Sequence, residues 1–314
     1  MSSFILALIF ISLTSSLLAT GAQYNVLSYG AKPDGKTDST KALVSAWKQA
    51  CASTRPATIT IPAGRFFISK ILFQGPCKNT AILISIDGTL VAPSDIWAIG
   101  NAGNWLHFEN VNGVTVSGGV LDGQGSGLWS CKASGKHCPS GATSLRFSGS
   151  RNIAITGLTS LNSQIIGSLG KDLREAGVQN VTVKSARIAG TQNGLRIKSW
   201  GRPSSGFARN IIFQHVAMNN VNNPIIIDQN YCPHNKNCPG QASGVKINDV
   251  TYQDIHGTSA TEVAVKFDCS KRNPCTGIRM EDVKITYNNR PADASCNNAD
   301  GKASGVVQPS SCLS

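Results

Sequence analysis

The residues with the clearest chemical potential are two cations, Arg196 and Lys198, in the run Gly194-Leu195-Arg196-Ile197-Lys198. Alternate residues of a strand point to one face and lie about 6–7 Å apart. Arginine can hold a carboxylate through two parallel hydrogen bonds, and lysine adds a point charge. Tyr231 could add a hydroxyl and a ring face. These residues suit a carboxylate-binding surface, but the spacing alone favours the alternative of a solvated basic pair and a buried tyrosine bonded to backbone.

Three aspartates are candidates for acid–base chemistry. Asp228 is the best placed, because it lies in a β-rich run near Tyr231, and Asp122 and Asp172 are further candidates. A positioned general acid or base contributes about 10²–10⁴-fold to a rate. Each aspartate also fits a turn-forming or locally hydrogen-bonded role, and that interpretation is favoured. Asp228 is therefore a weak catalytic candidate, and no residue is predicted to be catalytic.

Cysteine usage indicates an oxidising compartment. The ten cysteines form neighbouring pairs in chain order, so local disulfide pairing is the simplest prediction, although sequence alone does not fix connectivity. Zinc is the weaker alternative, because Cys-x2-Cys spacings are absent and His234 is the one candidate ligand nearby, so no metal is predicted. The candidate disulfide cysteines are Cys51, Cys77, Cys131, Cys138, Cys232, Cys238, Cys269, Cys275, Cys296 and Cys312.

The charge of the chain favours a polyanionic partner. Lysine and arginine number 29 against 17 aspartates and glutamates, which gives a formal net charge of +12. Nucleic acid, anionic lipid or an acidic polysaccharide would suit such a surplus, and a solvated basic surface is the alternative. The basic residues form no run of five or more. An exported protein rarely meets nucleic acid, so an acidic polysaccharide is the preferred partner and nucleic acid is not expected.

Residues 1–22 have the pattern of a secretory signal peptide. The apolar run from Phe4 to Ile11 is followed by small residues at Ala19, Gly21 and Ala22. A buried N-terminal helix is the alternative. No later segment approaches ~18 uninterrupted apolar residues, so the mature protein is predicted to be secreted and to have no membrane span. Asn180 begins an Asn-Val-Thr sequon and is a candidate glycosylation site.

One segment has a convincing helical pattern. Leu43, Trp47 and Ala50 recur at helical spacing, and Asp38 or Ser39 could cap the N-terminus, so a helix is expected over 38–51. The chain then changes to short β-type segments separated by Gly, Asn and Ser. The glycine-rich stretch 123–127 resembles a nucleotide-binding loop, but no helical pattern follows it. Nucleotide binding and organic cofactors are therefore not predicted.

Several β-type segments repeat along the chain. Those beginning at Asn152, Asn180, Asn210, Gly244 and Gly277 resemble one another, and their starts are 28, 30, 34 and 33 residues apart. A period of about 20–50 residues is typical of a solenoid. With short strands, this period predicts an all-β parallel β-helix, in which stacked Val and Ile rows form the core and the N-terminal helix caps the first coil. A β-sandwich is the alternative, with strands every 8–12 residues.

The sequence resembles one specific family. The opening Tyr24-Asn25-Val26-Leu27-Ser28-Tyr29-Gly30 and the later Gly167-Ser168-Leu169-Gly170, Gly194-Leu195-Arg196-Ile197-Lys198 and Asp228-Gln229-Asn230-Tyr231-Cys232 are similar to plant polygalacturonases. The similarity runs from about Tyr24 to the C-terminus. It implies a right-handed parallel β-helix in the cell wall that hydrolyses α-1,4-linked galacturonan by inversion, without metal or organic cofactor. It also implies that Arg196, Lys198 and Tyr231 contact the sugar, which reverses the preference for a solvated basic pair.

The family's catalytic motifs are missing from this chain. Inverting hydrolysis needs one carboxyl group to protonate the leaving oxygen and another to activate water, about 6.5–9.5 Å away. The family supplies these groups from Asn-Thr-Asp and Asp-Asp motifs, with a Gly-His-Gly histidine beside them. Asn-Thr-Asp and Asp-Asp do not occur, and the motif around His256 lies after Tyr231, in the wrong order. Activity is therefore expected to be weak or absent.

The position of the missing segment can also be predicted. Gln164 runs directly into Ile165, although the family has several more coils between the corresponding stretches. The removal of whole coils would leave a solenoid able to fold, because each coil touches only its neighbours. Residues 23–314 are therefore predicted to form one shortened β-helix domain, most simply a monomer. Three hypotheses follow: a polygalacturonase by lineage, a non-catalytic secreted pectate-binding protein, or an incomplete chain that folds poorly.

Overall fold

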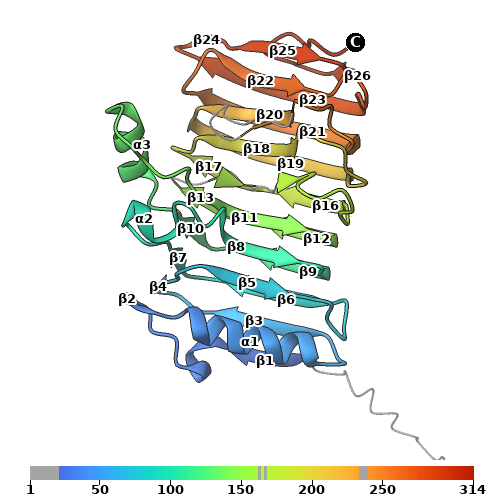
Figure 1. Ribbon diagram of the computed structural model, residues 1–314. Coiled ribbons are helices and arrows are strands. Elements are labelled where there is room, and N and C mark those ends of the chain that lie inside the picture. Colours follow the sequence, from blue (N-terminus) through green and yellow to red (C-terminus); the bar gives the residue numbers. More distant parts are fainter. Residues whose placement is uncertain (1–20, 162–163, 166–167, 233–239) are drawn as a thin grey trace, which may run out of the picture.

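The chain winds as a parallel β-helix, with each coil lying on the previous one (Figure 1). The computed structural model describes residues 21–161, 164–165, 168–232 and 240–314. The strands pair in parallel from coil to coil, and the solenoid predicted from the repeats is confirmed. The alternative β-sandwich is excluded, because a sandwich is built mainly from antiparallel strands.

The larger sheet, sheet A, forms two sides of each coil. Its 17 strands pair in parallel, apart from one antiparallel pair near the C-terminus. They are β1 (Ala22–Asn25), β2 (Asp34–Asp38), β3 (Ala57–Ile61), β4 (Arg65–Phe67), β6 (Ile82–Ile86), β7 (Thr89–Val91), β9 (Asn112–Ser117), β10 (Val120–Asp122), β12 (Arg151–Thr156), β13 (Thr159–Leu161), β16 (Val178–Lys184), β17 (Arg187–Ala189), β19 (Phe207–Val221), β21 (Lys246–Ser259), β23 (Cys275–Tyr287), β24 (Arg290–Pro291) and β26 (Ala299–Ser304).

Sheet B forms the third side of the coils and includes the strand that contains Arg196 and Lys198. Its nine strands follow the order of the chain from one end of the solenoid to the other. They are β5 (Ile71–Gln74), β8 (Asn104–Glu109), β11 (Thr143–Ser148), β14 (Gln164–Ile165), β15 (Ser168–Leu169), β18 (Asn193–Trp200), β20 (Asn223–Tyr231), β22 (Val263–Asp268) and β25 (Asp293–Asn297).

The core consists of in-register rows of apolar side chains that point into the coils. In sheet A, Ile155 of β12 lies between Val116 of β9 and Val183 of β16. In sheet B, the Phe108 ring stacks on Phe147, with centroids 4.9 Å apart, and on Phe73 at 4.3 Å. β-Branched and aromatic side chains fit such a pleated surface, and each coil buries its apolar face only against its neighbours.

Helix α1 (Thr40–Ala52) closes the N-terminal end of the solenoid, as predicted (Figure 1). Leu43 and Trp47 of this helix are buried in the core, and the Trp47 indole N–H donates to the Gln74 carbonyl at 3.0 Å. The helix begins two residues later than expected. Asp38 accepts a hydrogen bond from the Thr40 N–H at 2.9 Å. The Ser39 hydroxyl instead accepts one from the backbone N–H of Lys32, so it does not cap the helix.

Two further helices were not predicted from the sequence. Helix α2 (Ile96–Ile99) has four residues, too few to show a helical period. Helix α3 (Ser126–Ala133) has glycine and serine among its first residues, and one buried side chain, Leu128. The expectation that no helix follows the glycine-rich stretch 123–127 is therefore wrong, because α3 begins inside that stretch.

The C-terminal end of the solenoid is closed by the last segment of the chain. Strands β23 and β24 form the antiparallel pair, and the tail then returns along β23, where the Gln308 N–H donates to the Val283 carbonyl at 2.7 Å. Val307 and Leu313 pack against the core. The Cys296–Cys312 disulfide fastens the tail to β25. Helix and tail thus cover opposite ends of the solenoid.

Four predicted disulfides are present, each between cysteines that are neighbours in chain order. They are Cys51–Cys77, Cys131–Cys138, Cys269–Cys275 and Cys296–Cys312. The fifth predicted pair includes Cys238, which lies outside the described residues. Most of the predicted signal peptide, residues 1–20, also lies outside them, and β1 begins at Ala22. Within the described part of the chain, no helix has the length and apolar character needed to cross a membrane.

Candidate functional site

Arg196 and Lys198 lie on the outer face of sheet B, as their alternation predicted. Both approach the ring of Tyr231 on the next strand, with the Arg196 Cζ 5.3 Å and the Lys198 Nζ 4.2 Å from its centroid. Trp200 meets the same ring edge-on at 5.5 Å. Since a cation is attracted to the face of an aromatic ring, Tyr231 helps to hold both side chains. The three residues predicted to bind a sugar acid therefore form one cluster.

Lys198 is the most unusual cation of this cluster. It is only 9% exposed, and no residue in the described part of the chain accepts a hydrogen bond from its Nζ. Burial, with the nearby charges of Arg196 and Arg146 acting in the same direction, lowers the pKa of Lys198 to about 7. An ammonium group largely withdrawn from water is unfavourable unless an anion pairs with it, so an anionic ligand at this point would be stabilised.

Arg196 already has a carboxylate partner inside the chain. Its Nη2 lies 3.1 Å from the Asp228 Oδ2, and both side chains are largely shielded from solvent. Burial raises the pKa of Asp228, and Arg196 acts in the opposite direction. Asp228 therefore balances a cation, which is the local role that the sequence favoured over catalysis. The Arg196 Nε is buried without an acceptor among the described residues, so any hydrogen bonds to a ligand would come from the remaining Nη N–H groups.

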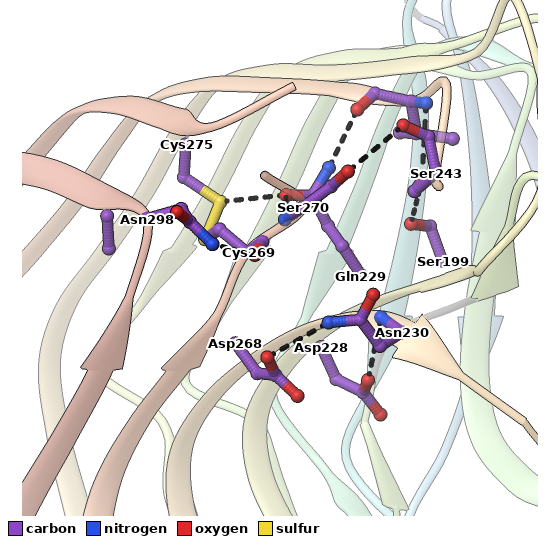
Figure 2. The surroundings of a disulfide bond; sticks show 12 residues. Ser199, Asp228, Gln229, Asn230, Ser243, Asp268, Cys269, Ser270, Cys275 and Asn298 are labelled. Carbon is purple, nitrogen blue, oxygen red and sulfur yellow. Dashed lines mark hydrogen bonds between the residues drawn. A yellow bond between two sulfur atoms is a disulfide. The ribbon is translucent and has the colours of Figure 1, made fainter. Parts of the chain in front are cut away.

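A buried polar network fixes the strands beneath the cluster. The Gln229 side chain donates to the Val245 carbonyl at 2.7 Å and accepts from the Ser270 N–H at 2.9 Å. The Ser199 and Ser243 hydroxyls bond to each other at 2.9 Å. Figure 2 shows how this network and the Cys269–Cys275 disulfide join the ends of three successive coils. Lys198 and Asp228 directly precede two of these residues, so their backbone positions are fixed.

Sequence reasoning missed a second carboxylate beside Asp228. Asp268 on β22 is in register with Asp228 on β20, and the Asn230 amide donates to its Oδ1 at 2.9 Å (Figure 2). Aligning residues 265–268 with residues 225–228 as equivalent repeats would have revealed it. Neighbouring strands lie about 4.8 Å apart, and both strands lie on the same side of Lys198. The two carboxylates therefore do not face each other across the cation pair.

The other predicted aspartates lie away from the cluster. Asp122, on β10 of sheet A, forms an ion pair with Arg65 at 3.2 Å and accepts from the Gln124 N–H. Asp172 is exposed in the loop after β15. The same loop contains Glu175, which the sequence did not single out. Its carboxylate accepts hydrogen bonds from the Gly170 and Lys171 N–H groups, and burial raises its pKa.

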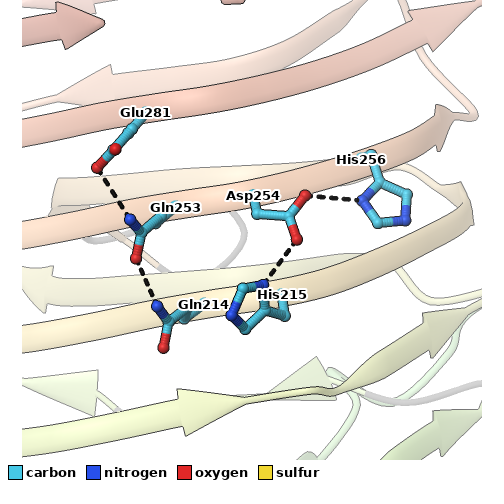
Figure 3. Close-up of polar contacts among 6 residues, drawn as sticks. All are labelled: Gln214, His215, Gln253, Asp254, His256 and Glu281. Carbon is cyan, nitrogen blue, oxygen red and sulfur yellow. Dashed lines mark hydrogen bonds and ion pairs between the residues drawn. The ribbon is translucent and has the colours of Figure 1, made fainter. Parts of the chain in front are cut away.

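His256 does not join the site either. It lies on β21 of sheet A, where its Nδ1 is 3.5 Å from the Asp254 Oδ1, while the His215 Nδ1 is 2.7 Å from Oδ2 (Figure 3). The three side chains are 45–58% exposed on a flat strand surface. Hydrogen bonding from His215 is the main cause that lowers the pKa of Asp254. His256 therefore cannot replace the family's catalytic histidine beside Lys198.

No metal centre is formed by the described residues, in which no group of three or more His, Cys, Asp or Glu side chains has a suitable arrangement.

The candidate glycosylation site, Asn180, belongs to a ladder of amide side chains on sheet A. Its Nδ2 donates to the Asn152 Oδ1 at 2.9 Å, and its Oδ1 accepts from the Asn210 Nδ2 at 3.2 Å. All three residues have φ between 54° and 56°, a conformation that asparagine tolerates better than most residues. The ladder explains why Asn recurs at the start of these repeats. Attachment of a glycan at Asn180 stays a prediction.

The chain belongs to glycosyl hydrolase family 28. The model of this family, described as "Glycosyl hydrolases family 28", matches residues 51–166 and 165–307, which together make up most of the chain. The chain is also similar to a "Polygalacturonase" of Prunus persica, with 53% identity over 388 aligned positions that cover 99% of each protein. An "Exopolygalacturonase" of Platanus acerifolia is 32% identical over 372 positions, covering 93% of this chain and 98% of the relative.

Solved structures agree with the fold. The structure described as "Iota-carrageenase complexed to iota-carrageenan fragments" has a TM-score of 0.51 and 16% identity, and the match covers 84% of this chain and 55% of that chain. At this identity the likeness concerns the fold alone. The chain is thus a right-handed parallel β-helix of glycosyl hydrolase family 28, and the predicted fold and family are both confirmed.

Proposed function

We propose that this protein binds acidic pectin, as galacturonan, on the outer face of sheet B and hydrolyses it weakly or not at all. Lys198 carries the proposal, because it is a nearly buried cation that lacks an acceptor among the described residues and lies 4.2 Å from the Tyr231 ring centroid. A galacturonate carboxylate would supply that acceptor. The identity to proteins named polygalacturonase supports galacturonan as the polymer.

The absence of a suitable carboxyl pair supports weak or absent catalysis. Asp228 and Asp268 are adjacent on one side of Lys198, and each is already engaged, by Arg196 and Asn230 respectively. An inverting pair instead lies across the sugar, with a gap of about 6.5–9.5 Å that admits water. Losing both the acid and the base removes two contributions of about 10²–10⁴-fold each.

The proposed loss of whole coils has support from pairing and from alignment. Strand β12, before the junction at 164–165, pairs directly with β16 after it, and Ile153 and Ile155 remain in register with valines. The two family matches meet at 165–166. The alignment with the peach relative takes 388 positions, although this chain has 314 residues, a difference of more than two repeats of 28–34 residues. A solenoid accommodates such an excision, because its coils have equivalent ends.

We also propose that the protein is secreted into the cell wall as a monomer. Four disulfides suit an oxidising compartment, and the pattern of residues 1–22 suits export. The formal net charge of +12 suits a polyanionic wall polymer.

The test compares binding and cleavage in the same preparation. Retention on immobilised polygalacturonate should fall on Lys198→Met, whereas Lys284→Met, which removes an exposed lysine of sheet A, should leave it unchanged. Reducing ends released from polygalacturonate should stay at background for the wild type. Rapid release that is lost on Asp228→Asn or Asp268→Asn would show that these carboxylates are catalytic and would refute the proposal. Equal retention of both lysine variants would refute the binding site.

A further inference from the structure

Helices α2 and α3 form a wall beside the outer face of sheet B. They project from the solenoid near the beginnings of β8 and β11 (Figure 1). A pocket joins the two helices to these strands and is lined by Ile96, Leu128, Trp105 and Ser144, among others. Trp105 alternates with the core residue Leu106, so it shares the outer face with His107. The wall therefore rests on the same face that carries Lys198.

An exposed indole projects from this wall. Trp97 of α2 is 48% exposed although its ring stacks on His137, with centroids 5.8 Å apart and an interplanar angle of 28°. Asp95 caps the start of α2 by accepting a hydrogen bond from the backbone N–H of Trp97 at 2.9 Å, and the Cys131–Cys138 disulfide closes the loop that carries His137. The backbone of Trp97 is thus fixed by the helix cap and its ring is packed against His137, while 48% of the side chain stays exposed.

Charges of both signs lie near this indole: the exposed Asp95 precedes it by two residues, and the loop that carries His137 is cationic. Residues 123–142, which contain α3, include no aspartate or glutamate, and their charged side chains are Lys132 and Lys136. Both lysines are exposed. Lys132 lies over the Trp129 ring at 5.4 Å and donates to the Ser140 carbonyl, whereas Lys136 directly precedes His137. An aromatic face beside cations suits a sugar that has an apolar ring face and a carboxylate.

We propose that Trp97, with His137 and Lys136, forms a second contact for the acidic sugar chain, separate from the contact at Lys198. The inference rests on the proposed function, because it concerns the same polymer. Trp97 would stack on the apolar face of a pyranose ring, and Lys136 would face the carboxylate.

The distance between the two contacts sets the length of ligand required. Strand β8 beside the wall and strand β18 of Lys198 are separated by β11 and then by the coil of β14 and β15. Three strand spacings correspond to about 14 Å along the solenoid axis. Arg146 of β11 lies between them and lowers the pKa of Lys198 through its charge. An oligomer laid along the axis could reach both contacts, whereas a disaccharide could occupy only one.

The experiment measures the affinity of oligogalacturonates of two and of eight sugars by titration calorimetry, with melting curves to verify folding. Trp97→Ala should weaken binding of the octamer about three- to tenfold and leave the dimer within twofold, if the dimer occupies the Lys198 contact. Trp97→Phe should retain most of the octamer affinity. Leu173→Ala, which truncates an exposed side chain in the loop after β15, should change neither.

Each outcome separates the two proposals. Octamer affinity that falls on Lys198→Met but not on Trp97→Ala would overturn the second contact and leave the proposed function intact. A fall on Trp97→Ala but not on Lys198→Met would overturn the Lys198 site while supporting the wall. Loss of dimer and octamer affinity to the same extent on Trp97→Ala would overturn the two-contact arrangement. Equal binding of a neutral glucan octamer would overturn the preference for an acidic sugar.

Discussion

The proposed binding of galacturonate at Lys198 should depend on pH, and the size of this dependence can be calculated. Burial lowers the pKa of this lysine to about 7. About nine in ten Lys198 side chains are then charged at pH 6, against about one in ten at pH 8. If the ammonium form is the one that binds a carboxylate, affinity should fall about tenfold over this range, or about 1.4 kcal/mol. A galacturonate carboxylate stays ionised throughout, so the ligand does not produce the change.

The assay is a titration of an oligogalacturonate at pH 6, 7 and 8 at constant ionic strength. Lys198→Met removes the titrating group and should give weak binding with a flat profile. Lys266→Met removes an exposed lysine of β22 and should keep the wild-type slope. Wild-type affinity that stays within twofold from pH 6 to pH 8, or a Lys198→Met variant with an unchanged slope, would refute the reasoning.

The same burial predicts a gain of stability when Lys198 is replaced. The pKa is about 7 in the folded protein and 10.5 in the reference state, so the unfolded chain binds more protons between these values. The contribution of Lys198 to the free energy of unfolding therefore rises with pH between these values. Below pH 7 the folded protein bears the whole cost of burying the charged lysine. Lys198→Met should unfold at a higher temperature at pH 6, by about 1–4 kcal/mol in free energy of unfolding. An unchanged or lower melting temperature would contradict this.

Three further predictions concern stability, each measured as the free energy of unfolding in urea. Arg196→Ala should lower it by about 2 kcal/mol, and adding Asp228→Ala should restore part of the loss, because the first change leaves a shielded carboxylate unpaired. Asn180→Ala should cost about 2 kcal/mol and Asn180→Gly about 1, because glycine tolerates φ 56°. Replacing both Cys51 and Cys77 by serine should cost about 3–4 kcal/mol, because this disulfide spans 26 residues. Losses below ~0.5 kcal/mol would contradict each prediction.

The sequence predicted the architecture well because a solenoid repeats its signal in every coil. Asparagines at intervals of 28 and 30 residues mark equivalent corners, and hydrogen bonds join Asn180 to Asn152 and Asn210. Alternation placed Arg196 and Lys198 on one face for the same reason. The four disulfides could be predicted because each joins cysteines that are neighbours in chain order, so no long-range contact had to be known.

The rest of the site depends on loop lengths that the period does not fix. Lys198 and Asp228, in register, are 30 residues apart, whereas Asp228 and Asp268, also in register, are 40 apart, because a longer loop separates β20 from β21. The pairing of Asp268 with Asp228 therefore could not be found by counting residues. The ion pair of Arg196 likewise depends on a coil-to-coil contact, and α2 is too short to leave a pattern.

The different closures at the two ends of the solenoid have a consequence for association. Every coil is built to receive another coil, so an open end would accept a second molecule and then a third, producing filaments. Helix α1 occupies one end with Leu43 and Trp47, and the tail fastened by Cys296–Cys312 occupies the other. The end strands β1, β2 and β5 at one end, and β25 and β26 at the other, each pair with a single strand. The helix and the tail should therefore oppose end-to-end association, as expected for the proposed monomer, even when the number of coils changes.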